Sequence, residues 1–131
     1  MQITLETDYA VRCLVYLKDH AGETCVLGDI SKGTLIPRAF LSKILQKLIR
    51  DGLVRSTKGK NGGFTLAVPA RGVSVYRIMQ AVCGRESVLK TVCRKPGHPC
   101  SLSRSCRISA VWRDLCGMVR KKLESHRLSD L

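Results

Sequence analysis

Long apolar runs are missing from this sequence. No stretch approaches the roughly 18 residues that a membrane-spanning helix requires, which excludes an ordinary integral membrane protein. The first residues, 1–6, also lack the basic and then apolar pattern of a secretory signal. Hydrophobic residues make up 44% of the 131 residues, which suffices for one small domain with an appendage. We therefore expect a soluble protein of the cytoplasm.

Acidic residues are also scarce. The chain has 10 Asp and Glu against 23 Lys and Arg, which gives a formal net charge of +13. Between Lys32 and Lys60 there are eight basic residues and a single acid, Asp51. A basic element of this kind is what a polyanionic partner requires. It favours nucleic acid over a merely solvated basic face or an acidic lipid surface.

Signatures of catalysis are absent as well. No pair of nucleophile and general base stands out, and no pattern indicates a substrate pocket. The Gly-rich stretch 58–63 does not fit the phosphate-binding pattern G-x-x-x-x-G-K-[ST]. We expect a protein that is not an enzyme. An electron-transfer or enzyme subunit remains as an alternative, and it would bind a redox partner without salt-sensitive binding to duplex DNA.

The first half of the chain predicts three helices. Residues 5–19 have helical spacing and end near Gly22, and residues 27–32 form a short helix that stops at Gly33. Pro37 then opens a third helix, because proline suits the first turn. The third helix ends near Gly52, and its inward stripe comprises Leu41, Ile44, Leu45, Leu48 and Ile49.

A hairpin and a fourth helix follow. Residues 53–57 and 64–68 are β-prone and flank a turn rich in Gly and Asn, which is a hairpin signal. Ser74 is a suitable N-cap for a helix that Gly84 closes. This order predicts a mainly α chain with a small β-hairpin, namely a winged helix-turn-helix DNA-binding domain over residues 1–84.

The third helix is the predicted recognition helix. Residues near the N-terminal end of such a helix reach base edges in the major groove, while a basic hairpin tip reaches phosphates or a minor groove. The predicted DNA contacts are Arg38, Ala39, Ser42, Lys43 and Lys47 on the helix, and Lys58, Lys60 and Asn61 at the hairpin tip. Each phosphate contact should add about −0.9 to the slope of log affinity against log salt.

Three cysteines stand close together in a basic segment, residues 85–107. Cys93, Cys100 and Cys106 have the spacing C-x6-C-x5-C. The chain has seven cysteines, an odd number, and no visible export signal, so a disulfide scaffold is disfavoured. Thiolates suit an iron–sulfur cluster or zinc, and the neighbouring positive charge favours the thiolate form. The spacing therefore predicts a metal centre.

A fourth ligand is open on the residues alone. The candidates are His98, Cys83, Cys116 and, from a partner chain, Asp8. A lone acid in a first helical turn is normally a surface residue that complements the helix dipole. Of the remaining cysteines, Cys13 is expected in the core, Cys116 is expected to be packed, and Cys25 is left unassigned.

The last segment, residues 105–131, predicts a long helix from about Ser105 to Glu124. Its apolar stripe comprises Ile108, Val111, Trp112, Leu115, Met118, Val119 and Leu123. This is too much apolar surface for a lone exposed helix. Pairing with the same helix of a second copy is favoured over packing on its own domain. A two-fold dimer would present two recognition helices to a pseudo-palindromic site.

Taken together, residues 4–12 (TLETDYAVR), residues 58–67 (KGKNGGFTLA) and the cysteine triad resemble the bacterial winged-helix iron–sulfur regulators of the IscR and NsrR type. The resemblance implies a homodimeric repressor whose iron–sulfur cluster tunes promoter binding. Its three thiolate ligands correspond to Cys93, Cys100 and Cys106. One branch adds a histidine three residues after the third cysteine, where this chain has Ser109.

Another branch of the same family uses an acid of the first helix from the partner chain, and Asp8 matches that position. The resemblance thereby favours Asp8 as fourth ligand, a [4Fe–4S] over a [2Fe–2S] cluster, and nitric oxide, redox stress or iron–sulfur status as the signal. The first spacer has six residues where five is common. Structural zinc or a metal-free thiol switch are the alternative interpretations.

Overall fold

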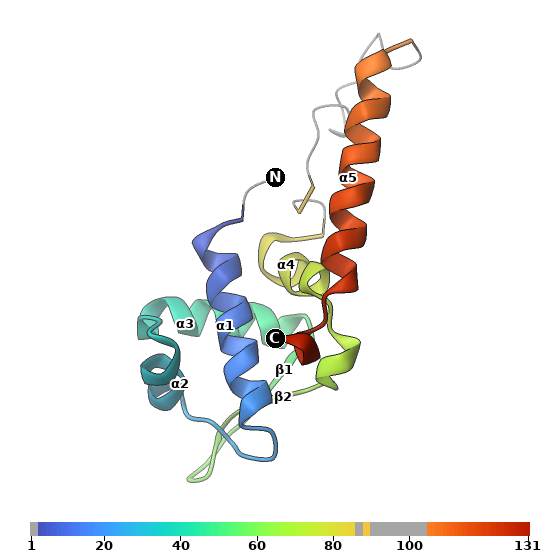
Figure 1. The fold of residues 1–131 in the computed structure, drawn as a ribbon. Helices are drawn as coiled ribbons and strands as arrows, with labels where there is room; N and C mark the ends of the chain where they lie inside the picture. Colours follow the sequence, from blue (N-terminus) through green and yellow to red (C-terminus); the bar gives the residue numbers. More distant parts are fainter. Residues whose placement is uncertain (1–2, 86–87, 90–104) are drawn as a thin grey trace.

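The computed structural model describes residues 3–85, 88–89 and 105–131, and Figure 1 shows its elements. The predicted ligands Cys93 and Cys100, and the candidate His98, lie outside these residues. The elements in chain order are α1 (Leu5–Asp19), α2 (Leu27–Thr34), α3 (Arg38–Arg50), β1 (Val54–Thr57), β2 (Gly63–Leu66), the short 3-10 helix η1 (Ala70–Gly72), α4 (Val75–Cys83), α5 (Arg107–Ser125) and a second 3-10 turn, η3 (Leu128–Asp130). The predicted order of helices and hairpin is confirmed.

Helix α1 packs against α2, the first helix of the helix-turn-helix. The Thr4 side chain caps α1 by accepting a hydrogen bond of 3.3 Å from the Thr7 backbone N–H. The predicted stop of α2 at Gly33 is wrong, because Gly33 lies inside the helix. A Cβ at this position would collide with the Tyr16 ring of α1. Gly33 therefore serves close packing of α1 on α2, and the helix continues to Thr34.

The turn between α2 and α3 bends at Leu35. This residue has φ +58°, a left-handed conformation that costs a non-glycine residue about 1–2 kcal/mol. Two hydroxyl hydrogen bonds of 2.6 Å hold the turn: Ser31 donates to the Ile36 carbonyl and Thr34 donates to the Ile30 carbonyl. The Ser31 bond spans the turn and holds the segment before α3 against α2, whereas the Thr34 bond closes the last turn of α2.

A single core joins the helices and the base of the hairpin. From α3, Leu41, Ile44, Leu45 and Leu48 are buried as predicted, and Ile49 is half-buried. Cys13 lies in this core with no exposed surface, and Cys25 is buried at its edge. Full burial of each large aliphatic side chain contributes roughly 1.5–3 kcal/mol. The core therefore fixes α3 against the rest of the domain.

Strands β1 and β2 pair antiparallel, with Val54 opposite Leu66 and Thr57 opposite Gly63. The loop before α2 joins this hairpin, because Cys25 and Phe64 exchange two backbone hydrogen bonds of 3.0 and 2.8 Å. At Gly63 a Cβ would lie 2.5 Å from the Cys25 carbonyl oxygen, so only glycine permits this approach. The hairpin is thereby attached to the helical body.

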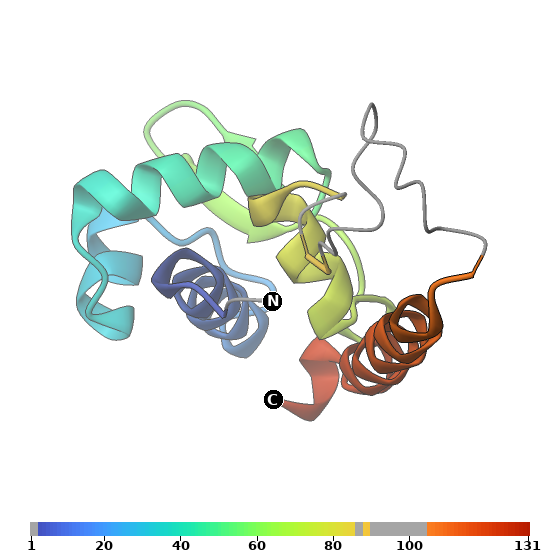
Figure 2. The ribbon, with the colours of Figure 1, turned by 90° about the horizontal axis from the view of Figure 1, so that it is seen from above.

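Helix α4 lies between the helix-turn-helix and α5 when the molecule is viewed from above (Figure 2). The predicted Ser74 cap is confirmed, with the Ser74 hydroxyl accepting from the Arg77 N–H at 3.2 Å. Helix α5 runs alongside α4 at one end and extends beyond the body at the other (Figure 1). No helix in the described ranges combines the length and the apolar character needed to cross a bilayer.

The chain beyond α5 returns to the body. Leu128 of η3 is fully buried in the core, and its N–H donates to the Val73 carbonyl at 2.8 Å. The Val75 N–H donates to the His126 carbonyl at 2.9 Å. These contacts anchor the base of the long helix to the segment that precedes α4.

Candidate nucleic-acid interface

One face of α3 is exposed along its whole length. Positions three and four residues apart share a helix face, so Ala39, Lys43, Gln46 and Arg50 lie together, opposite the buried leucine stripe. All four are exposed. Ala39 and Lys43 of this face are among the predicted DNA contacts. Gln46 and Arg50 share the face and are not among them, although the same spacing places them there.

Arg38 and Ser42 occupy a flank of this face. The Arg38 guanidinium lies against Gly28 in the first turn of α2, where a Cβ would come within 2.9 Å of Nη2. Ser42 is half-buried on the same flank. The Arg38 guanidinium is thus held at the first turn of α2, and a guanidinium suits phosphate oxygens.

Lys47 points elsewhere. It lies on the opposite flank of α3, and its ammonium donates to the Glu6 carboxylate of α1 at 2.5 Å and to the Val82 carbonyl of α4 at 3.0 Å. A contact between Lys47 and DNA would require breaking this arrangement. The predicted DNA role of Lys47 is therefore not supported by its orientation, whereas Ala39 and Lys43 face solvent.

The hairpin tip adds a second basic surface. Lys58, Lys60 and Asn61 are exposed on the turn, which a hydrogen bond of 3.0 Å from the Gly62 N–H to the Gly59 carbonyl closes. The single acid of the basic stretch, Asp51, is drawn away from this surface by an ion pair with Arg77 of α4 at 2.8 Å. The exposed surface of α3 and the hairpin tip is consequently of one sign, which concentrates positive potential.

The predicted metal ligands within the described residues lie on α1 and α5. Asp8 is half-exposed and forms an ion pair of 2.6 Å with Arg12 one helical turn away. Cys106 is the half-buried N-cap residue of α5, and its carbonyl accepts a hydrogen bond of 2.7 Å from the Ser109 hydroxyl. Over the described residues alone, no three ligating side chains converge.

The other cysteines fall into two groups. Cys13 is fully buried as predicted, and burial raises the pKa of its thiol to about 12, so the thiolate is scarcely populated at neutral pH. Burial also raises the pKa of Cys25. Cys83 and Cys116 are half-buried, and the Cys83 sulfur lies 3.4 Å from the Thr7 hydroxyl. Cys25, left unassigned on sequence, thus belongs to the core.

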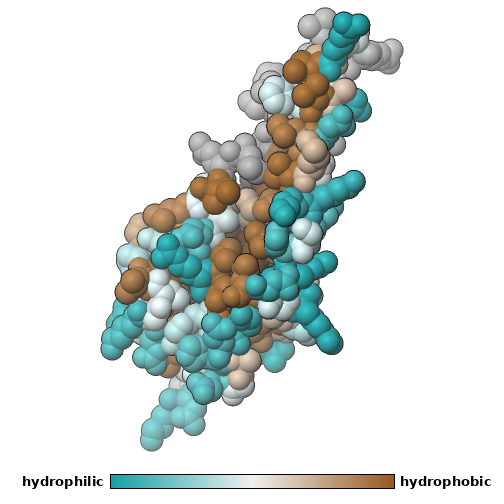
Figure 3. Space-filling model, in the orientation of Figure 1, coloured by the Kyte–Doolittle hydropathy of each residue, from teal (hydrophilic) through white to brown (hydrophobic). Residues whose placement is uncertain are grey.

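The apolar stripe of α5 is uncovered in the single chain. The side chains far from the body are between 43% and 63% exposed, and they are Ile108, Val111, Trp112, Leu115 and Met118. Val119 and Leu123 are half-buried toward the body. Figure 3 shows the stripe as a brown band along the projecting helix. An apolar surface of this length on a projecting helix is typical of a protein–protein interface.

Comparison with known proteins agrees with this architecture. The family model Rrf2, described as an iron-dependent transcriptional regulator, matches residues 3–131. The HTH-type transcriptional regulator IscR of Vibrio campbellii is 31% identical over all of this chain and 77% of its own length.

Two solved structures share the fold. CymR, the global cysteine regulator of B. subtilis, has a TM-score of 0.78 at 19% identity, covering 99% of this chain and 95% of its own. The oxidized form of Staphylococcus aureus CymR has a TM-score of 0.75 at 23% identity, covering 99% of this chain and 94% of its own.

Proposed function

Because the chain belongs to the Rrf2 family of transcriptional regulators, we propose that it is a cytoplasmic repressor that binds a pseudo-palindromic DNA duplex as a homodimer. The observation that carries this proposal is the exposed face of α3, on which Ala39, Lys43, Gln46 and Arg50 are free of the core. The length and diameter of α3 suit the major groove. Lys and Arg on this face favour guanine, Gln favours adenine, and Ala39 suits a thymine methyl group.

The hairpin contributes affinity and register. Lys58 and Lys60 at its tip, with Asn61 between the strands, would contact phosphates or enter the adjacent minor groove. Arg38, held against the first turn of α2, would bind a phosphate at the other side of the groove. These contacts carry little sequence information, so we assign specificity to the α3 face and salt dependence to the flanks.

We assign the dimer contact to the α5 stripe. Two copies of α5 that bury Ile108, Val111, Trp112, Leu115 and Met118 against each other would remove the exposed apolar band of each chain. The buried cores of protein–protein interfaces are enriched in aromatic residues and methionine, and the stripe contains one of each, Trp112 and Met118. Such a dimer places two α3 helices at separate half-sites, which matches the symmetry of a pseudo-palindromic operator.

We further propose that Cys93, Cys100 and Cys106, with Asp8 of the partner, hold an iron–sulfur cluster, with [4Fe–4S] favoured. The donor set fits, because three thiolates and one carboxylate bind iron, and the positive charge around the cysteines offsets an anionic cluster. The bound cluster would supply iron that reacts with nitric oxide or responds to redox state and iron supply. For Asp8 to serve as a ligand, it must leave its ion pair with Arg12.

A metal-free thiol switch is the second candidate. Its support is the shared fold with a CymR whose structure was solved in an oxidized form. In this chain Cys83, Cys106 and Cys116 are only half-buried, so reagents reach them more readily than Cys13 and Cys25. Structural zinc in the cysteine segment is the third candidate.

Anaerobic purification followed by absorption spectroscopy and iron, sulfide and zinc analysis separates the three candidates. A brown protein with iron and sulfide supports the cluster. A colourless protein with stoichiometric zinc, or with no metal after reconstitution, replaces it with one of the alternatives.

The DNA function is tested by fluorescence anisotropy with a duplex that the wild-type protein selects from a random library. We expect Lys43→Gln to weaken binding by about 1–3 kcal/mol if Lys43 reads a guanine. Lys121→Gln removes the same charge from the exposed surface of α5 and serves as the matched control. Equal affinities of wild type and Lys43→Gln would refute the assigned interface.

A further inference from the structure

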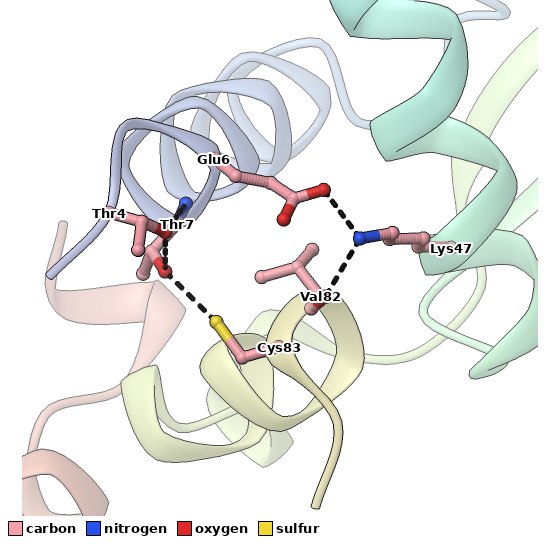
Figure 4. A network of polar contacts seen from close by, with 6 residues as sticks. All are labelled: Thr4, Glu6, Thr7, Lys47, Val82 and Cys83. Carbon is pink, nitrogen blue, oxygen red and sulfur yellow. Dashed lines mark hydrogen bonds and ion pairs between the residues drawn. The ribbon is translucent and has the colours of Figure 1, made fainter. Parts of the chain in front are cut away.

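Lys47 is the one predicted DNA-contacting lysine of α3 whose ammonium turns toward its own chain (Figure 4). It lies in the last turn of α3 and reaches the Glu6 carboxylate in the first turn of α1 and the Val82 carbonyl in the last turn of α4. The side chains of Lys47 and Glu6 are only 37% and 39% exposed. One ammonium therefore joins three helices at a partly desolvated point.

The partners of Lys47 have a common relation to the cysteine-bearing segment. Val82 is the penultimate residue of α4, and the chain passes from Cys83 through the Gly84 cap into residues 85–107, where Cys93 lies. Glu6 is two residues from Asp8 of the same chain, which in the proposed dimer would be a ligand of the partner's cluster. The two segments that would contribute cluster ligands, one to the chain's own cluster and one to the partner's, are thus both adjacent to contacts of Lys47.

A second contact reinforces the junction without involving α3. The Thr7 hydroxyl of α1 lies 3.4 Å from the Cys83 sulfur of α4 (Figure 4). Thr4, the N-cap residue of α1, accepts a hydrogen bond from the Thr7 backbone N–H. The contact between Thr7 and Cys83 ties the start of α1 to the end of α4. The two helix ends that carry the acceptors of Lys47 are therefore in direct contact with each other.

From this geometry we propose that Lys47 is a positioning residue that transmits the state of the cysteine-bearing segment to the recognition helix. The inference rests on the proposed function, because it requires a segment whose state changes. Charge-assisted hydrogen bonds are about twice as strong as neutral ones, and a carbonyl at the end of a helix has no partner within that helix. When the end of α4 or the start of α1 shifts, α3 either follows the ammonium or loses these bonds. Both outcomes alter how α3 enters the major groove.

Lys43 provides a matched control on the same helix. It is one turn before Lys47, equally basic, and exposed on the DNA face. Substitution by methionine removes the charge and keeps an unbranched side chain at either position. Loss of Lys43 removes a DNA contact in every state of the protein, whereas loss of Lys47 removes the coupling between states.

The experiment measures the dissociation constant for the selected duplex in two states, the anaerobically reconstituted protein and the reduced, metal-free protein. Coupling of ordinary strength makes the wild-type ratio of the two constants about 5- to 150-fold. We expect Lys43→Met to weaken both states and keep that ratio. We expect Lys47→Met to bring the ratio within about threefold of unity, and Lys47→Arg to restore most of it.

The outcomes separate the two proposals. A wild-type ratio of unity overturns the proposed regulation and this inference with it. A wild-type ratio that persists in Lys47→Met overturns the role of Lys47 alone. If Lys47→Met does not fold, Glu6→Gln replaces it, since glutamine keeps the size of the side chain and removes its charge. If the ratio of the two dissociation constants is at least about twofold smaller in Glu6→Gln than in wild type, the inference is supported, and a ratio equal to that of wild type overturns it.

A readout that does not depend on DNA accompanies these measurements. Backbone amide hydrogen exchange of the metal-free protein reports opening of helix ends. We expect Lys47→Met to speed hydrogen exchange in the last turns of both α3 and α4. Lys43→Met, in contrast, should leave the exchange rate in the last turn of α4 unchanged. Exchange at the end of α4 that is the same in both variants contradicts the junction.

Discussion

Leu115 lies at the middle of the exposed stripe of α5, and its replacement by glutamate tests the dimer. Leu115 is 44% exposed in the single chain. Full burial of a leucine contributes roughly 1.5–3 kcal/mol, so burying the exposed part contributes about 1 kcal/mol per chain. The interface of a two-fold dimer contains this residue twice, and the loss is therefore about 2 kcal/mol before any cost of charge.

The charge adds to this loss. Two glutamates brought into an apolar contact near the symmetry axis must be desolvated, and each such burial is unfavourable without a partner. We expect the dissociation constant of the Leu115→Glu dimer to rise by more than about 30-fold, since 1.4 kcal/mol corresponds to a factor of ten. Sedimentation velocity over a range of protein concentrations measures the constant directly.

Lys121→Glu is the matched control for this substitution. Lys121 is exposed on α5 and lies outside the apolar stripe. Lys121→Glu therefore introduces the same side chain as Leu115→Glu, but outside the assigned contact. Its dimer should dissociate like wild type. A Leu115→Glu protein that remains as dimeric as Lys121→Glu would refute the assignment of the stripe to self-association.

Three further predictions concern stability and reactivity. Leu35→Gly should raise the free energy of unfolding by about 0.5 to 1 kcal/mol in denaturant titration. The φ of +58° costs leucine about 1–2 kcal/mol, glycine loses about 0.5–1 kcal/mol more entropy on folding, and Leu35 is 82% exposed, so little packing is lost. A destabilised variant contradicts this. Cys13 has a pKa of about 12 in the folded protein against an ordinary value of 9.0, so wild type should lose stability relative to Cys13→Ala as pH rises from about 9 to about 12, and parallel stability curves contradict this. In the native protein at pH 8, iodoacetamide should label Cys83 before Cys13, as peptide mass spectrometry will show, and equal labelling contradicts the burial of Cys13.

The order of elements could be predicted because its signals are local. Pro37 and Gly52 bound α3, Ser74 and Gly84 bound α4, and each position is confirmed by the cap it occupies or adjoins. Hydrophobic spacing likewise identified the buried side of α3. Caps and hydrophobic spacing depend on local backbone geometry and on the helical period of about 3.6 residues. Both can be predicted from the sequence without knowing the tertiary contacts.

Two features of the structure depend on tertiary contacts. Gly33 was predicted to end α2, but the helix continues to Thr34, and the close approach of the Tyr16 ring of α1 explains why this position is a glycine. Lys47 was predicted to contact DNA together with Lys43, one turn before it, but the Lys47 ammonium is bound to Glu6 of α1 and Val82 of α4. Hydrophobic periodicity predicts which face of a helix is buried, but not which neighbouring helix packs beside it. The approach of Tyr16 to Gly33 and the hydrogen bonds of Lys47 were therefore not predictable from the sequence.

The cysteine segment is a different case. The spacing of Cys93, Cys100 and Cys106 predicts binding of a soft metal, but the proposed fourth ligand, Asp8 of a partner chain, would depend on how two chains meet. Within one chain Asp8 pairs with Arg12, and a residue pattern within a chain does not predict a ligand that a second chain would donate. The family resemblance, rather than spacing, was what singled out Asp8.

The anchoring of α5 links the proposed dimer to the DNA-binding face. Leu128 is fully buried beside Val73, and the backbone joins Val75 to His126, so the base of α5 cannot rotate freely against α4. In the proposed dimer, pairing of two α5 helices would therefore fix the distance between the two DNA-binding domains, and each domain holds its α3 through the leucine core and Lys47. A signal would then need only to change how α3 sits in its own domain, because the pairing of the long helices could remain unchanged.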